Sequence, residues 1–350
     1  MSKQACVRLT LAALFTSAVT AAHAENSVTI SGNYYKERST RIYEPFVRVT
    51  ADLPYETEVD VAYLVDNITS ASAAFTSTDE PFSEFRHEIR LGAKKKFFDM
   101  LIPGVTFRYS KEPDYESYTV GGSLAVNLFD ENTTVAAYVQ RQSDEVRQRG
   151  REGFVESLDN TFFGLSVTQV LLKNLIGGVS FDNSAPRGYQ ENPYRAELHP
   201  RERDRYSVAA WLGFRHIPTG TSVKGWYRLY TDSWDINAHS FQIETSQRIV
   251  RGLEINPRFR YHTQGDAFFC APVSMRAPGR DPNANTQDPK LCAFNSFTVG
   301  AQVAWTQSWL RGTPLELFAT SRIEPAYYFF RQTNRYGDAH IAQLDWYWPF

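Results

Sequence analysis

The sequence predicts an all-β fold, a transmembrane antiparallel β-barrel with about sixteen strands. Three observations lead to this prediction: an N-terminal export signal, apolar and polar residues that alternate up to the last position, and connections that are alternately short and long. After residue 24 no run of about 18 apolar residues occurs, which excludes helical spans. A closed barrel is the β structure that satisfies its own backbone in lipid.

The N-terminus has the pattern of a secretory signal peptide. Two basic residues precede an apolar stretch at 9–19, and the small-x-small sequence Ala22-His23-Ala24 follows as a cleavage site. We therefore expect residues 1–24 to be removed and residues 25–350 to form the barrel. A retained anchor is the alternative, but the apolar stretch is shorter than the roughly 20 residues of a spanning helix.

The last strand is predicted from period-2 alternation. Its apolar positions are Ala342, Leu344, Trp346, Trp348 and Phe350. Such alternation, ending on an aromatic residue, is typical of a lipid-facing transmembrane strand. It also resembles the C-terminal signature by which outer-membrane barrels are recognised for assembly. We therefore expect Trp346, Trp348 and Phe350 to form a signal for the barrel-assembly machinery, and the protein to lie in the outer membrane of a Gram-negative bacterium.

Composition narrows the class of partner. Aromatic residues make up 14% of the chain, and the formal net charge is only −2. No basic patch on the scale of a nucleic-acid binder is implied, so we do not expect nucleic acid as a partner. Outer-membrane lipid and small polar solutes are the expected partners, and a protein partner stays open.

Turn residues divide the chain into strand-length segments. Short connections are expected at 54–56, 99–101, 130–132, 173–174, 217–220, 251–252 and 311–314. Longer ones are expected near 67–83, 111–115, 143–157, 184–203, 231–235, 265–293 and 331–335. This alternation predicts short periplasmic turns and longer extracellular loops, with both termini in the periplasm.

Strands placed between these connections number sixteen. The first two are 27–38 and 41–53, and the last two are 314–330 and 336–350. Fourteen strands are the alternative, if the first hairpin is a separate element. Nothing in the sequence indicates a second domain, a plug or an internal repeat.

Alternation also assigns charged residues to the face opposite the apolar one. Acidic residues of the early strands are Glu44, Asp52, Glu58, Asp60 and Asp66; basic residues of later strands are Arg86, Arg90, Lys94, Lys96, Arg108, Arg205, Arg215, Lys224, Arg228, Arg248, Arg258 and Arg260. Charges in hydrocarbon are costly, so these side chains should line water or pair with one another. The predicted lumen-lining set is Glu44, Asp60, Asp66, Arg90, Arg228, Arg258 and Arg260.

Acidic strands that face basic strands across the lumen would set a transverse field, from which channels derive solute selectivity. The alternative is that the charges pair into a closed network that fills the barrel and leaves no open path.

Two cysteines follow the signal peptide, Cys270 and Cys292, in one loop rich in Pro, Gly, Asn and Asp. In an oxidising envelope they are expected to form one structural disulfide that tethers this loop. No His or further Cys lies near either cysteine in sequence, so no metal site is expected. No cofactor is expected either.

Two stretches are more distinctive than strand patterning requires, YYKERSTRIYEP at 34–45 and YLVDNITSAS at 63–72. With these stretches the chain resembles a family of uncharacterised predicted Gram-negative outer-membrane barrels, a domain of unknown function. The resemblance implies location and fold, and it transfers no catalytic position. Glu37, Arg38 and Arg41 could form a rim constellation near Asp66, or the stretches could be only a hairpin and a tethered loop.

The function classes that remain are a channel and a scaffold. A barrel phospholipase would place His and Ser two apart on one lipid-facing strand, but His239 is followed directly by Ser240. His199 lies in a loop among charged residues, which is more often a solvated cluster than a site. We therefore expect no enzyme but a porin-like channel for small polar solutes. The alternative is a non-conducting scaffold or receptor that acts through loops such as 184–203 or through a partner protein.

Overall fold

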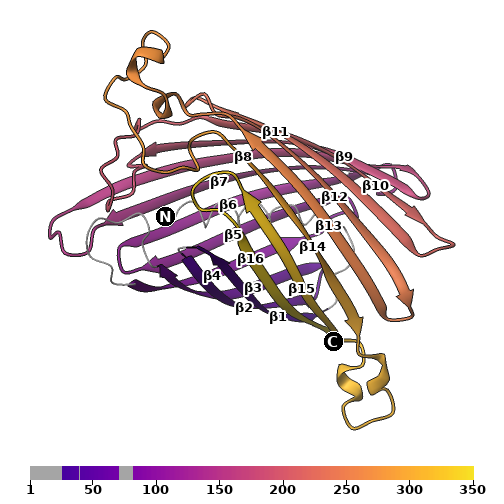
Figure 1. Ribbon diagram of the computed structural model, residues 1–350. Helices are drawn as coiled ribbons and strands as arrows, with labels where there is room; N and C mark the ends of the chain where they lie inside the picture. Colours follow the sequence, from indigo (N-terminus) through magenta and orange to yellow (C-terminus); the bar gives the residue numbers. More distant parts are fainter. Residues whose placement is uncertain (1–25, 39, 71–81) are drawn as a thin grey trace.

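The computed structural model describes residues 26–38, 40–70 and 82–350, and the expected signal peptide lies outside them. These residues form a closed barrel of sixteen antiparallel strands (Figure 1). The strands are β1 (Ser27–Glu37), β2 (Thr40–Leu53), β3 (Thr57–Ser70), β4 (Phe82–Lys95), β5 (Leu101–Glu112), β6 (Tyr115–Leu128), β7 (Thr133–Arg147), β8 (Val155–Leu172), β9 (Leu175–Gly188), β10 (Arg205–His216), β11 (Thr221–Asp232), β12 (Asn237–Val250), β13 (Leu253–Gln264), β14 (Phe294–Thr306), β15 (Arg322–Gln332) and β16 (Ala339–Pro349).

Each strand pairs with its neighbours in sequence, and β1 closes the ring against β16. In this seam Ile30 lies opposite Trp346, and Val28 lies opposite Trp348. The first hairpin is therefore part of the barrel, which confirms the count of sixteen strands and rejects fourteen. Within the part of the chain that the structure describes, no helix has the length and apolar character needed to cross a membrane.

Strand β4 shows how the two faces of the wall differ. Phe85, Ile89 and Leu91 are exposed, whereas the alternating Arg86 and Glu88 are buried. A soluble protein buries its large apolar residues and exposes its charges. The reversed distribution is that of a barrel wall whose outer face meets lipid.

One end of the barrel carries mostly tight turns, at 54–56, 96–100, 129–132, 173–174, 217–220 and 251–252. The exception is the connection at 307–321, drawn in gold beside the C-terminus in Figure 1. It contains the 3-10 helices η3 (Ser308–Leu310) and η4 (Glu316–Phe318). The predicted strand at 314–330 is thus wrong at its start, since β15 begins at Arg322. Pro314, which cannot donate to a strand ladder, lies inside this connection.

The opposite end carries the longer loops at 148–154, 189–204, 265–293 and 333–338. The connection at 71–81 lies outside the described residues. The loop at 265–293 contains η1 (Phe268–Cys270) and η2 (Val273–Met275), and it rises from the barrel in orange in Figure 1. Two expected longer connections are tight instead: only residues 113–114 join β5 to β6, and only 233–236 join β11 to β12.

Candidate functional site

The buried face of strands β2 to β5 carries a network of paired charges, which we call the paired sector: Glu44, Asp66, Arg86, Glu88, Arg90 and Arg108. Arg86 lies 3.2 Å from Asp66, with both side chains buried. Glu88, the most buried of the set, accepts a 2.5 Å hydrogen bond from Arg90 Nε and lies 3.3 Å from Arg108. Asp66, Arg86, Glu88, Arg90 and Arg108 therefore each have an opposite charge close by.

Register explains this pairing. Asp66 lies directly opposite Arg86 between β3 and β4, and Glu58 lies opposite Lys94, 3.0 Å away in an ion pair. The predicted arrangement, with acidic strands facing basic strands across the barrel, is wrong here, because the acids pair with bases on the next strand. Charges held at this distance on adjacent strands cancel locally and set little long-range field.

Asp60 occupies the same face and is opposite Gly92. A Cβ atom on Gly92 would lie 2.1 Å from Asp60 Oδ1, so the carboxylate lies against bare backbone. A larger residue at position 92 would displace the Asp60 carboxylate.

A second group of charges lies on β11 and β13, and we call it the arginine sector: Lys224, Arg228, Arg258 and Arg260. Arg258 Nε forms an ion pair with Glu244 at 2.6 Å, and its guanidinium lies over the Tyr328 ring. Arg228 donates a 3.0 Å hydrogen bond to the Ser207 hydroxyl.

Arg260 has no acidic partner among the residues that the structure describes. Its guanidinium lies 5.8 Å from the centre of the Trp226 ring, and Lys224 lies 4.4 Å from the Trp211 ring. The residues opposite Arg260 in the ladder are Gln242 and Thr298, which are neutral. Positive charge is therefore left over in this sector.

The loop at 189–204, which we call the strap, crosses the end of the barrel that carries the long loops. Tyr194 Oη donates a 2.8 Å hydrogen bond to Asp114 Oδ2 and accepts one from the Arg149 backbone N–H. The next residue, Arg195, donates to Tyr336 Oη at 3.4 Å. Asp114 joins β5 to β6 and Tyr336 joins β15 to β16, which are distant parts of the ring. The strap is therefore tied to separate arcs of the rim.

A small apolar core fixes the strap to its neighbours. Trp234, Ile236, Ala267, Phe269 and Ala284 form a buried cluster in the loops. The His199 ring of the strap lies 5.3 Å from Phe269 and 5.4 Å from Trp234. The sequence reading of His199 as a solvated residue is therefore wrong, because its side chain is buried.

Burial also changes the acid strength of the strap. It lowers the pKa of His199 below its ordinary value of 6.5, although Glu197, Glu191 and Asp288 act in the opposite direction. Burial raises the pKa of Tyr194 to about 12. Both groups are accordingly neutral at pH 7.

The predicted disulfide between Cys270 and Cys292 is confirmed, with Cα atoms 5.6 Å apart. It closes the 265–293 loop, whose Asn285 exchanges two backbone hydrogen bonds with Leu198 of the strap, at 2.9 and 3.2 Å. Arg203 anchors the other side of the strap: its Nε donates to Asp232 at 2.8 Å and its guanidinium lies over Trp234.

The predicted rim constellation is not assembled on one face. Glu37 is buried and accepts a 2.7 Å hydrogen bond from Tyr35 Oη, whereas Arg38 and Arg41 are exposed. Asp66 belongs to the paired sector.

The C-terminal aromatic residues form a row. The Trp346 and Trp348 rings are 6.0 Å apart, and the Trp348 and Phe350 rings are 5.0 Å apart. The row lies at the end that carries the tight turns, and Phe350 is 56% exposed. Trp346, Trp348 and Phe350 are thus placed on the outer face, next to the seam.

Among the residues that the structure describes, two groups bring possible metal-ligand atoms close together. Glu84, Glu112 and Asp114 bring carboxylate oxygens within 4.8 Å of one another beneath the strap, and Tyr194 bonds to one of them. Asp266 lies near Cys270 and Cys292, but sulfurs joined in a disulfide do not provide thiolate ligands.

A cross-strand pair that the sequence did not reveal joins Ser240 Oγ to His262 Nδ1 at 2.8 Å. Ser240 is only 5% exposed, and the third group, Gln264 Oε1, is neutral and 3.4 Å from His262 Nε2. A catalytic nucleophile needs access to substrate and an oriented base. The pair therefore belongs to the wall and provides no catalytic site.

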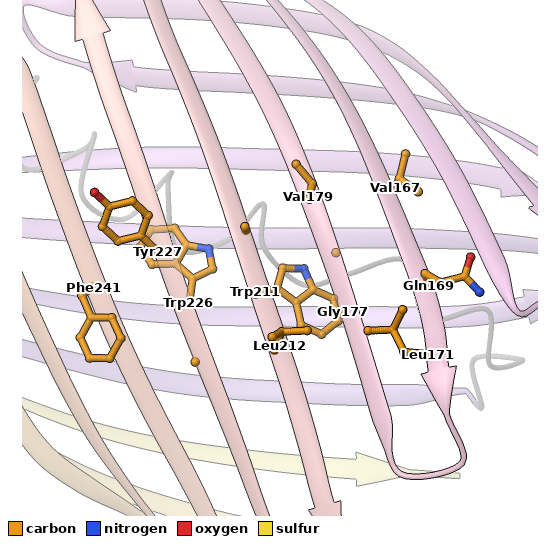
Figure 2. Close-up of a pocket in the computed structure, with 13 residues that line it drawn as sticks. Val167, Gln169, Leu171, Gly177, Val179, Trp211, Leu212, Trp226, Tyr227 and Phe241 are labelled. Atoms are coloured by element: carbon orange, nitrogen blue, oxygen red, sulfur yellow. The ribbon is translucent and has the colours of Figure 1, made fainter.

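A groove of about 490 Å³ lies over β8 to β12 (Figure 2). Exposed apolar residues such as Leu171, Val179 and Leu212 line it, together with Gly177 and Gly225. No charged residue lines it. The groove is a depression in the apolar outer face, and its lining offers no carboxylate, lysine, arginine or histidine for acid–base chemistry.

The fold is similar to those of several solved outer-membrane proteins. OccD3 (OpdP) from Pseudomonas aeruginosa matches with a TM-score of 0.51 and 11% identity over 93% of this chain and 91% of that chain. A BenF-like porin from Pseudomonas fluorescens Pf-5 matches with a TM-score of 0.50 and 9% identity, covering 93% and 98%. CdiB from Acinetobacter baumannii matches with a TM-score of 0.58 and 8% identity, covering 93% of this chain and 60% of CdiB.

A comparison with curated proteins gives no match. Residues 155–311 match the family described as "Protein of unknown function (DUF3570)". This region contains the strap and the arginine sector, whereas the stretches at 34–45 and 63–72 precede it. The sequence resemblance to a domain of unknown function is thereby confirmed. The match to this family thus covers β8 to β14 of a sixteen-stranded barrel that is similar in fold to outer-membrane porins.

Proposed function

We propose that the protein lies in the outer membrane of a Gram-negative bacterium and passes small polar solutes through a charge-lined lumen. The observation that carries the proposal is the reversed distribution on the wall, with apolar residues exposed and charges buried, as on β4. Only lipid outside and polar material inside make that distribution favourable. In this orientation the tight turns and both termini face the periplasm, and the strap faces outward.

The lumen is lined by the predicted set: Glu44, Asp60, Asp66, Arg90, Arg228, Arg258 and Arg260. Support comes from alternation, since each lies on the opposite face from exposed apolar neighbours. The paired sector contributes little net field, whereas the arginine sector leaves positive charge beside the path. We therefore expect a preference for anions.

The strap sets how open the outer mouth is. Residues 194 and 195 are bonded to distant parts of the rim, so the loop narrows any path beneath it. Loops folded over a barrel mouth restrict passage without any change in the wall.

Single-channel recording in a planar bilayer tests the proposal. The refolded protein should give small, steady conductance steps. The variant Y194F/R195Q, which removes both rim attachments, should give larger steps because the mouth widens. Y206F, which alters an exposed tyrosine on the outer face, is the matched control and should match the parent protein. A bilayer that stays silent for all three after verified insertion would reject the channel.

The tied strap also favours one other function, a non-conducting receptor or scaffold that acts through its loops. This alternative predicts silence in the parent protein and in Y194F/R195Q alike. No chemical step enters either proposal, and the porin-like fold is consistent with a protein that is not an enzyme.

We also propose that Trp346, Trp348 and Phe350 are read by the barrel-assembly machinery. Phe350 is exposed at the end of the seam-forming strand, where a receptor can reach it. The variant F350A should therefore accumulate unassembled in cells yet refold normally in detergent. Normal levels of F350A in the outer membrane would contradict the proposal that Phe350 is part of the assembly signal.

A further inference from the structure

The connection at 307–321, here the folded turn, is built unlike the other connections at its end of the barrel. The Gln307 N–H donates a 2.9 Å hydrogen bond to the Ser321 carbonyl and closes the segment. Inside it Leu310 and Ala319 are buried. The segment is therefore a folded element with a fixed surface.

That surface presents three large apolar side chains beside the exposed Arg311 and Glu316. Trp309, Leu315 and Leu317 are 61%, 54% and 64% exposed. Large apolar side chains grouped on a folded element are unfavourable in water and mark a contact surface.

The surface continues the outer face of the barrel. The Trp309 ring stacks on Trp305 of β14, with ring centres 6.5 Å apart. Phe318 lies 5.0 Å from the Trp348 ring, and Trp348 Nε1 donates a 3.0 Å hydrogen bond to the Leu317 carbonyl. The last strand thus holds the folded turn, which projects past the end of the barrel beside the C-terminus (Figure 1).

Other hairpins at the same end add to this pattern. Tyr55, Phe98 and Phe129 sit at the tips of three of them and are 85%, 86% and 76% exposed. Exposed apolar residues therefore recur around the rim. A surface that surrounds the end of the barrel fits a lipid leaflet, whereas a protein partner would need one localised patch.

We propose that the folded turn is a membrane anchor whose Trp309, Leu315 and Leu317 insert into the headgroup and upper acyl region of the phospholipid leaflet at this end. The proposal rests on the membrane placement proposed above. Indole and leucine side chains suit this region, because one end of it is apolar and the other is hydrated. The anchor would hold the seam between β1 and β16 at a fixed depth.

A fluorophore that responds to polarity can be attached to a cysteine introduced at a chosen position. Cys270 and Cys292 are joined in a disulfide, so in the protein without its signal peptide the introduced thiol is the reactive one. Three positions are compared in phospholipid vesicles: L317C in the folded turn, L344C on the exposed wall, and M275C in the loop at the opposite end. L315C serves as a second turn position. Quenching by phospholipids brominated high in the acyl chain is measured.

We expect blue-shifted emission and strong loss of intensity for L317C and L315C, approaching the loss for L344C, and no loss for M275C. Quenching of L344C without quenching of L317C or L315C would overturn the anchor and leave the membrane placement intact, with a protein partner for the turn as the remaining occupant. Absence of quenching at L344C would overturn the membrane placement itself and the anchor with it.

Discussion

The paired sector and the arginine sector face the same space from the same kind of wall, yet one neutralises its charges and the other does not. In the first, Asp66 lies opposite Arg86, and Glu88 lies between two arginines. In the second, Arg260 lies opposite Gln242. The number of arginines is similar in the two sectors, and the residue across the ladder decides how much charge remains.

The two sectors are therefore expected to affect different properties, the stability of the barrel and the ion selectivity of the proposed channel. Buried pairs such as Asp66 with Arg86 hold neighbouring strands together but cancel each other's field. An arginine supported by an aromatic ring, as Arg260 is by Trp226, keeps its field available to solute. In the proposed channel, one wall sector would therefore serve the fold and the other would serve passage.

The largest effect is expected from E88Q, which breaks the paired sector. Loss of the carboxylate charge leaves Arg90 and Arg108 close together and uncompensated, at a cost of about 3–5 kcal/mol in the free energy of unfolding. Guanidinium unfolding in micelles measures it, with the exposed E316Q as control. R260Q should change stability by no more than about 0.5 kcal/mol. Equal losses for E88Q and R260Q would remove the distinction between the sectors.

A smaller effect is expected from Q242E, which places an acid opposite Arg260 and converts the arginine sector into a paired one. Anion preference should fall, whereas little stability should be gained, because the new carboxylate loses the 2.9 Å hydrogen bond that the Gln242 amide donates to Glu244. Reversal potentials under a salt gradient measure the preference. The variant Q247E, on the same strand but next to the tight turns, is the matched control; an equal fall there would mean that charge anywhere on β12 suffices.

The smallest effect concerns a third arrangement, the neutral buried His199 of the strap. Because burial lowers its pKa below 6.5, the docked strap binds fewer protons than the free one. Docking is therefore strongest above pH 6.5 and weakens as pH falls below it.

Hydrogen exchange of residues 189–204, corrected for intrinsic rates, should thus increase between pH 7.5 and 5.5 relative to β12. H199F keeps an aromatic ring against Phe269 and Trp234 and should lose the pH dependence. A pH response that persists in H199F would show that His199 is not its source.

Alternation and the turn residues predicted the barrel, its sixteen strands and its opposite faces, and the two cysteines predicted the single disulfide. It could not predict which charge contacts which, because alternation assigns a face and not a register. Glu88 illustrates this: its central place depends on the alignment of β4 with β5, which brings Arg90 opposite Arg108.

The contacts of the strap, whose loop was expected, and the folded turn were missed for a different reason. The burial of His199 depends on Trp234 and Phe269, which come from two other loops. Aromatic residues within segments expected to be polar connections were the available signal. In the folded turn, Leu315 and Leu317 were read as the start of a strand, and local pattern could not distinguish an apolar turn surface from a strand face.

The central claim, that the arginine sector lines an open path, is tested most directly by the single-channel reversal potential of R260Q under a potassium chloride gradient, with the turn variant R311Q as control. The parent protein and R311Q should prefer chloride, because the positive charge of Arg260 has no acidic partner among the described residues. R260Q removes this charge, so its reversal potential should shift toward that of potassium. A conducting R260Q with an unchanged reversal potential would contradict the placement of Arg260 beside the path.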